Sequence, residues 1–168
     1  MSETTISRSL SVEFGPLTSD LTTTTGTTAT VIAPFTGEVL HELPLSSASD
    51  VADAAASARA AAVAWRAAGH AHRRAVLLKA HDLLLERRDD LLDILQTETG
   101  KTRGQAFEEV FQGANVARYY AVKARGILAR HRRRATIPVI MQTRVSYKPK
   151  GLIGVITPWN YPLSLSLM

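Results

Sequence analysis

The chain of 168 residues is 45% hydrophobic and 21% charged, an ordinary soluble-globular composition that requires neither disorder nor a membrane. It contains no cysteine, so disulfides, thiolate nucleophiles and cysteine metal sites are excluded from these residues. The net charge of +5 is uneven, because all 15 acidic residues lie within residues 1–109 and residues 110–168 carry only basic ones. This asymmetry suggests a polyanion-binding tail or acidic partners elsewhere in the protein.

Nothing in the sequence predicts insertion into a membrane. No apolar run reaches the roughly 20 residues that span a bilayer. The first residues include Glu3, Glu13 and Asp20 and no hydrophobic core, so they match neither a signal peptide nor a transit peptide. We therefore expect a cytoplasmic protein with no membrane partner.

The first elements in chain order are a tail and a hairpin. Residues 1–28 end in a polar, threonine-rich stretch without periodicity, and we expect a tail or a loosely attached arm. Two β-favouring runs then flank PFTG at 34–37, where Pro34 and Gly37 suit a turn. This pattern predicts a β-hairpin over about residues 30–43.

A long helical region follows the hairpin. Ser47 and Asp50 have the spacing of a capping box, which predicts a helix start. An apolar stripe then recurs every three or four residues, and we expect it to be buried: Val51, Ala54, Ala55, Ala58, Ala62 and Trp65. Gly69 should end this helix, and the period continues to Gly100 as one bent or two abutting helices.

A further helix is predicted over about residues 102–128. Its expected buried face consists of Phe107, Val110, Phe111, Ala114, Ala117 and Ala121. After a basic stretch, residues 136–149 have the alternating character of two extended segments, and LIGVI at 152–156 has the composition of a strand buried in a parallel sheet. Pro162 suits the first turn of a last helix. The fold class is therefore α/β.

The turn GVITPWNYP at 154–162 is the main candidate site. Asn160 follows the predicted strand, and open α/β sheets bind ligands at the carboxyl ends of their strands. Its amide can donate hydrogen bonds to a developing oxyanion. It could instead cap the helix near Pro162, and the residues alone favour this capping role. Trp159 could stack on a cofactor or simply pack.

Two other groups of residues are weaker candidates. His70 and His72 have no third ligand nearby, so no metal site is expected. RHRRR at 130–134 could bind phosphates but lacks interleaved aromatic residues, so no nucleic-acid partner is expected. A basic polyanion-binding module remains an alternative function.

Four motifs in the same order resemble the aldehyde dehydrogenase family. They are LIGVITPWNYPL at 152–163, RYYA at 118–121, LQTETGK at 95–101 and the segment PFTGEVL to Trp65 at 34–65. The resemblance covers about residues 30–168 and is closest to bacterial succinate-semialdehyde dehydrogenase-like members.

The resemblance implies the N-terminal portion of the aldehyde dehydrogenase fold, incomplete in this chain. After the tail, residues 29–135 would form the hairpin and helices of the cofactor-binding domain. Residues 136–149 would form an oligomerisation arm. Residues 150–168 would supply the first strand, turn and helix start of the dinucleotide-binding sheet.

The implied activity is oxidation of an aldehyde, possibly succinate semialdehyde, to a carboxylate with NAD or NADP in a homo-oligomer. Asn160 matches the family's oxyanion-stabilising Asn, and with Ile156, Thr157, Pro158 and Trp159 it matches positions that line the cofactor. The family's nucleophilic Cys and general-base Glu have no counterpart, so this chain alone is expected to be inactive. The alternative is a non-catalytic truncated remnant or an assembly piece.

Overall fold

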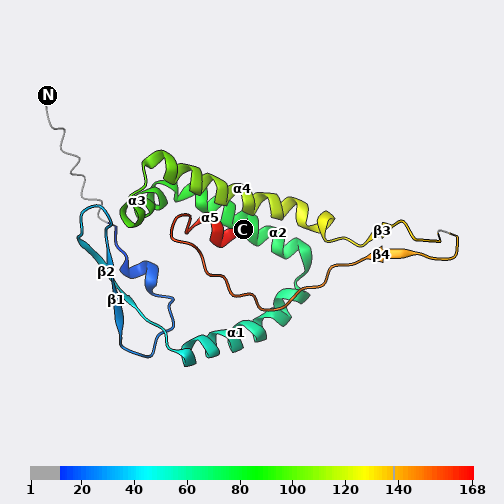
Figure 1. Cartoon of the computed structure of the whole chain (residues 1–168), viewed down its shortest axis with the longest axis horizontal. Coiled ribbons are helices and arrows are strands. Elements are labelled where there is room, and N and C mark those ends of the chain that lie inside the picture. Colours follow the sequence, from blue (N-terminus) through cyan, green and yellow to red (C-terminus); the bar gives the residue numbers. More distant parts are fainter. Residues whose placement is uncertain (1–11, 138) are drawn as a thin grey trace.

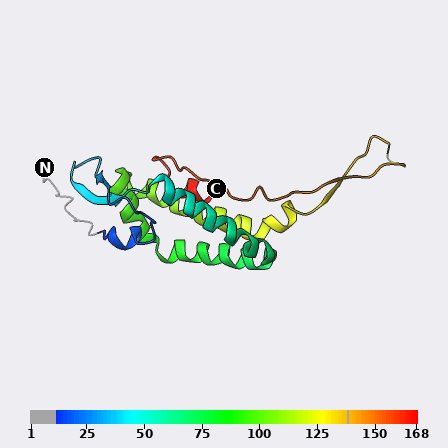
Figure 2. The same cartoon turned by 90° about the horizontal axis from the view of Figure 1, so that it is seen from below.

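The computed structural model describes residues 12–137 and 139–168, and it is an elongated molecule with a hairpin at each end of a helical bundle (Figures 1 and 2). In chain order the elements are η1 (Gly15–Thr18), β1 (Thr28–Ile32), β2 (Val39–Pro44), α1 (Ala48–Ala67), α2 (Gly69–Glu86), α3 (Arg88–Thr99), α4 (Arg103–Ile127), β3 (His131–Arg133), β4 (Thr143–Val145) and α5 (Ser164–Leu167). Each helix in this part of the chain is too short or too polar to cross a bilayer.

The N-terminal hairpin is confirmed. β1 and β2 pair antiparallel, with Thr28 opposite Pro44 and an irregularity between Val31 and Ile32. Gly37 has a φ of +74° in the turn, a conformation that favours glycine. The predicted tail lies partly outside the described residues, but residues 22–28 are held against the hairpin and α1. For example, Leu45 N donates to Thr27 O at 2.9 Å.

The predicted capping box at the start of α1 is also confirmed. Ser47 Oγ accepts from the backbone N–H of Asp50 at 3.1 Å, and the Asp50 carboxylate accepts from the backbone N–H of Ser47 at 2.7 Å. The same carboxylate accepts from the backbone N–H and the hydroxyl of Thr24, at 3.1 and 2.8 Å. These donors, led by the Ser47 N–H, lower the pKa of Asp50 from 3.8 to about 2.

The prediction that the α1 stripe is buried is wrong. Val51 is 61% exposed and Trp65 44% exposed, and α1 lies apart from the bundle of α2, α3 and α4 (Figure 1). Periodicity shows which face of a helix is apolar, but it does not show whether a partner covers that face. Gly69, with φ at +75°, ends α1 as predicted, and the region that follows it forms two abutting helices, α2 and α3, which meet at Arg87, as one of the two expected arrangements.

The core lies where α3 packs on α4. It is built from Leu92, Leu95, Ala106 and Val110, with Leu91 and Leu163 packed against it. Four of the six residues predicted for the buried face of α4 are buried: Val110, Ala114, Ala117 and Ala121. Phe107 and Phe111 are about half exposed, because each lies one position beyond the buried stripe of the helix. Their rings stack on each other with centroids 6.1 Å apart.

The second hairpin begins earlier than the sequence indicated. β4 lies in the predicted extended region, but it pairs antiparallel with β3, which comes from the basic stretch, and Arg132 stands opposite Arg144. Pro138 lies outside the described residues. This hairpin projects from the end of α4, well away from the helical bundle (Figures 1 and 2).

The prediction of a buried strand at residues 152–156 is not met in this chain. The segment is extended, yet it forms no ladder with any described strand, and Ile156 is 99% exposed. A strand exists only where neighbouring strands satisfy its backbone groups, and none of the described residues lies in that position.

Asp50 should make folding pH-dependent at low pH. Because folding lowers the pKa of this carboxyl, its contribution is complete above pH 3.8 and is lost as the pH falls through about 2. We expect Asp50→Asn to lower Tm at neutral pH and to weaken the drop in Tm between those values. Thermal unfolding against pH measures both effects, and Asp53→Asn, an exposed change on the same helix, is the control. Identical acid profiles for wild type and Asp50→Asn would contradict this role.

Candidate functional site

The turn that carries Asn160 lies on the surface, between the extended segment and α5. Asn160 is exposed, and its side chain makes no hydrogen bond with the described residues. The residue at the N-cap of α5 is Leu163, which provides no side-chain cap. The capping role that the residues alone favoured for Asn160 is therefore wrong for α5.

A buried carboxylate on α4 anchors the segment that follows this turn. Glu109 is 0% exposed, and its Oε1 accepts from the backbone N–H groups of Leu163 at 2.7 Å and Ser164 at 3.3 Å. Its Oε2 forms an ion pair with Lys101. An ionised carboxylate is tolerated in the interior only when charged and N–H donors surround it. Glu109 therefore ties the C-terminal segment to α4.

Lys101 links the same carboxylate to the turn itself. Its Nζ lies 4.6 Å from the centroid of the Tyr161 ring, within cation–π distance. The Lys101 side chain is only 13% exposed, so this contact is partly shielded from water. Tyr161 is the direct neighbour of Asn160, and its contact with Lys101 helps to hold the turn in place.

Two glycines allow the close packing around this anchor. Gly100 precedes Lys101 with φ at +71°, and a Cβ there would lie 3.3 Å from Phe35 Cδ1 of the hairpin turn. Gly113 lies one turn beyond Glu109, and a Cβ there would lie 3.1 Å from Leu167 Cδ1. A side chain at either position would require the contacted side chain to shift by a few tenths of an ångström.

The residues next to Asn160 present apolar surface to solvent. Ile156 is 99% and Trp159 86% exposed, Pro158 is exposed and Thr157 is half-buried. All five predicted site residues therefore lie together on one exposed turn. An apolar, partly aromatic surface beside an unpaired amide can hold a planar ring and donate a hydrogen bond to an oxygen.

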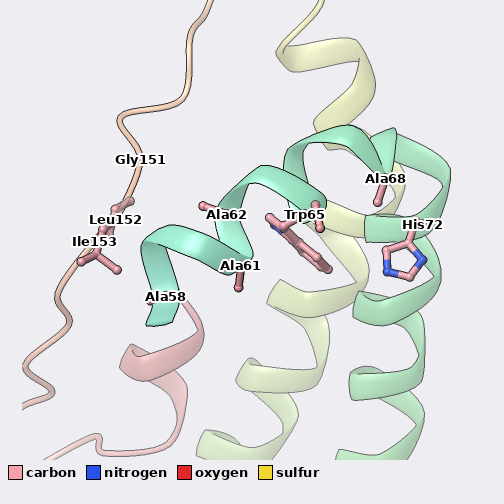
Figure 3. Close-up of a pocket in the computed structure, with 10 residues that line it drawn as sticks. Ala58, Ala61, Ala62, Trp65, Ala68, His72, Gly151, Leu152 and Ile153 are labelled. Carbon is pink, nitrogen blue, oxygen red and sulfur yellow. The ribbon is translucent and has the colours of Figure 1, made fainter. Parts of the chain in front are cut away.

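An open apolar hollow separates the extended segment from α1 (Figure 3). Leu152 and Ile153 lie on one side, and Trp65 lies on the other with alanines of α1. His72 contacts Trp65 edge-on, with ring centroids 5.7 Å apart. Within residues 12–137 and 139–168, no group of three His, Asp or Glu side chains has the arrangement of a metal site.

Comparison with known proteins assigns the chain to a family. Residues 21–168 match the family model described as "Aldehyde dehydrogenase family". The chain belongs to the aldehyde dehydrogenase family. A Mycolicibacterium smegmatis protein named "putative succinate-semialdehyde dehydrogenase (NADP+)" is 44% identical over 133 residues, which are 79% of this chain and 26% of that protein.

Solved aldehyde dehydrogenases share the fold. An NAD-dependent benzaldehyde dehydrogenase from Corynebacterium glutamicum superposes with a TM-score of 0.76 at 31% identity, over 88% of this chain and 32% of the other. An aldehyde dehydrogenase from Brucella melitensis gives a TM-score of 0.79 at 27% identity, over 88% of this chain and 30% of the other. The chain thus spans about a quarter to a third of the aldehyde dehydrogenases that it matches. The predicted N-terminal part of the aldehyde dehydrogenase fold is confirmed.

Sequence reasoning missed the anchor of this aldehyde dehydrogenase turn. Lys101 was noticed only within the LQTETGK motif, without a role, and Glu109 was not singled out. A signal was available, because Glu109 lies three residues after Ala106 and four before Gly113, on the buried stripe of α4. A lone acidic residue on such a stripe predicts a buried ion pair.

Glu109→Ala should release the C-terminal segment of this aldehyde dehydrogenase chain. The change leaves the ammonium of Lys101 and two backbone N–H groups without their partner, and breaking a buried pair costs about 3–5 kcal/mol. We expect the amides of Leu163 and Ser164 to exchange with deuterium much faster, and Tm to fall.

Glu108→Ala removes an exposed carboxylate from the adjacent position and is the matched control. Amide protection at residues 163 and 164 that is the same in both variants would show that the Glu109 carboxylate does not anchor the segment.

Proposed function

We propose that this chain provides the N-terminal part of an NAD- or NADP-dependent aldehyde dehydrogenase that oxidises the aldehyde group of succinate semialdehyde to a carboxylate. The observation that carries the proposal is the exposed turn 156–160, which Glu109 holds in place through the amides of Leu163 and Ser164. The substrate class rests on the name of the mycobacterial relative. Its name states NADP, and the corynebacterial enzyme is described as NAD-dependent, so both cofactors are kept.

Asn160 is the catalytic residue that this chain would contribute. When a nucleophile adds to an aldehyde, the carbonyl oxygen becomes an anion, and fixed N–H donors stabilise that charge. The Asn160 amide is neutral and unpaired, so it carries no competing bond that must first break. Its position next to Tyr161 and the Lys101–Glu109 pair limits the reorganisation needed during reaction.

The nicotinamide cofactor fits the apolar part of the same turn. Trp159 offers a flat aromatic surface and Ile156 an aliphatic one, both exposed, and Thr157 and Pro158 lie between them. When bound, NAD or NADP would accept the hydride that leaves the substrate carbon. The residues of this chain would orient the ring and shield it from water.

The nucleophile of the reaction is not among these residues. The family resemblance implies a Cys thiolate and a Glu general base, and the 168 residues contain no cysteine. We therefore assign to this chain the binding of cofactor and the polarisation of the carbonyl. Formation of the covalent intermediate requires other residues.

The function is tested with the full-length protein, succinate semialdehyde and either NADP or NAD. We expect formation of reduced cofactor, and Asn160→Ala should lower kcat by about 100- to 1000-fold, as for loss of one oxyanion donor. Asn160→Asp should be at least as damaging, because a carboxylate replaces the donor with a negative charge.

Residues 1–168 alone are the control and should form no reduced cofactor. Single-turnover rates should be measured beside steady-state rates, since a step other than hydride transfer can limit kcat. Near-normal turnover in both Asn160 variants would remove the catalytic role, and no turnover by the full-length protein would contradict the substrate.

We also propose that the β3–β4 hairpin joins subunits of a homo-oligomer. It projects beyond the bundle, and Ile140 is 82% and Val139 96% exposed near its tip (Figure 2). Arg132 stands opposite Arg144, an unfavourable pairing of like charges that an acidic surface on another subunit would relieve.

Deleting residues 137–147 should therefore convert the full-length protein into smaller species, as measured by sedimentation velocity. Arg118→Gln, an exposed charge change on α4, is the control and should leave assembly unchanged. An oligomer of the same size after the deletion would count against the arm.

A further inference from the structure

A second hollow, which shares Ala62, Trp65 and Gly151 with the hollow in Figure 3, lies between the α1–α2 junction and residues 147–151. Four of its lining side chains are permanently cationic at neutral pH: Arg66, Arg73, Lys148 and Lys150. None of the described residues that line it is acidic. The two arginines and the two lysines come from segments more than 70 positions apart, so the fold and not local sequence gathers these charges.

The four cations have no acidic partner among the described residues. The ion pairs in that part of the chain involve other basic side chains, namely His81, Arg88, Lys101 and Arg103. Cations gathered around one hollow repel each other unless an anion lies between them. This arrangement therefore favours occupation by a negatively charged ligand.

The backbone at the same place contains the end of α1 and the start of α2, which carry partial charges of opposite sign. α2 begins at Gly69, and its N-cap, Ala68, provides no side-chain hydrogen bond. The first N–H groups of a helix lack intrahelical partners and carry a partial positive charge. His70, in this first turn, lines the hollow.

The remaining wall of the hollow is aromatic and apolar. Trp65 and Tyr147 contribute their rings, together with Val63 and Leu128. Arg73 Nη1 donates to the backbone oxygen of Trp65 at 3.0 Å, which fixes this arginine across the α1–α2 junction. Aromatic surface beside several cations suits a ligand that has both a flat body and a charged group.

We propose that this hollow binds a small organic anion composed of a phosphate group and a planar aromatic body. The phosphate would lie against Lys148, Lys150 and Arg66, and the aromatic body against Trp65 and Tyr147. A dianionic phosphate matches several cations better than a single carboxylate does. The hollow shares no lining residue with the turn 156–160, so this inference does not depend on the proposed function.

The test titrates the 168-residue chain with phenyl phosphate. Trp65 and Trp159 are its two tryptophans, so Trp159→Phe makes Trp65 the sole tryptophan reporter. We expect saturable quenching of Trp65, with inorganic phosphate and phenol each binding at least about 10-fold more weakly because each lacks half of the recognised chemistry.

Lys148→Gln with Lys150→Gln should raise Kd for phenyl phosphate by about 10-fold or more, the loss expected for one or two charge-assisted contacts. Both lysines are exposed, so the fold should be retained, which circular dichroism checks. Arg118→Gln with Lys123→Gln removes the same charge from exposed positions on α4 and should change Kd less than about 2-fold.

Three results would overturn the proposal. One is no saturable quenching of Trp65 by phenyl phosphate up to about 10 mM. Another is equal weakening in the lysine pair and the α4 control pair, which would show a general charge effect. The third is equal affinity for inorganic phosphate, which would show that the aromatic wall takes no part.

Discussion

The carboxylate of Glu109 is the constraint on which the arrangement of the candidate site depends. It is fully buried, and its donors come from the turn before α4 and from the backbone before and at the start of α5. A buried ionised group is stable only with its complete set of donors, so these three segments must assemble together. The exposed turn that carries Asn160 is thereby attached to the most tightly packed part of the molecule. The side chains of this turn are therefore exposed, while the residues that follow it are held by buried contacts with Glu109.

The same molecule leaves large apolar surfaces uncovered. The alanine-rich face of α1 lies on one side of the open hollow in Figure 3, and Leu152 and Ile153 of the extended segment lie on the other. An extended, apolar segment without a neighbouring strand tends to bind other chains, because its backbone groups lack hydrogen-bond partners and its apolar side chains are exposed to water. These surfaces are suited to contact further protein structure, in keeping with relatives of which this chain matches about a quarter.

The two candidate ligand sites are linked through one stretch of chain. Residues 147–151 line the cationic hollow, and the extended segment then leads directly to the turn 156–160. Trp65 lines both hollows that flank this stretch. An anion bound by Lys148 and Lys150 would connect the start of the extended segment to the α1–α2 junction. Glu109 holds the chain beyond the other end of this segment, at Leu163 and Ser164. Both ends of an otherwise unsupported segment would then be held.

Much of the local structure followed from the sequence by itself, because it depends on interactions between residues close in the chain. The Ser47–Asp50 capping box, the Pro34–Gly37 turn and the end of α1 at Gly69 are of this kind. The site roles of the five residues of the turn 156–160 came from the family resemblance and stay predictions. Other features needed the tertiary structure. Periodicity could not show that the apolar face of α1 is uncovered, that residues 152–156 lack neighbouring strands, or that β4 pairs with the basic stretch. The Glu109 anchor and the cationic hollow join residues that are 54 or more positions apart, or that come from separate helices and loops. Only the path of the folded chain brings such groups together, and burial then decides which charges must be paired.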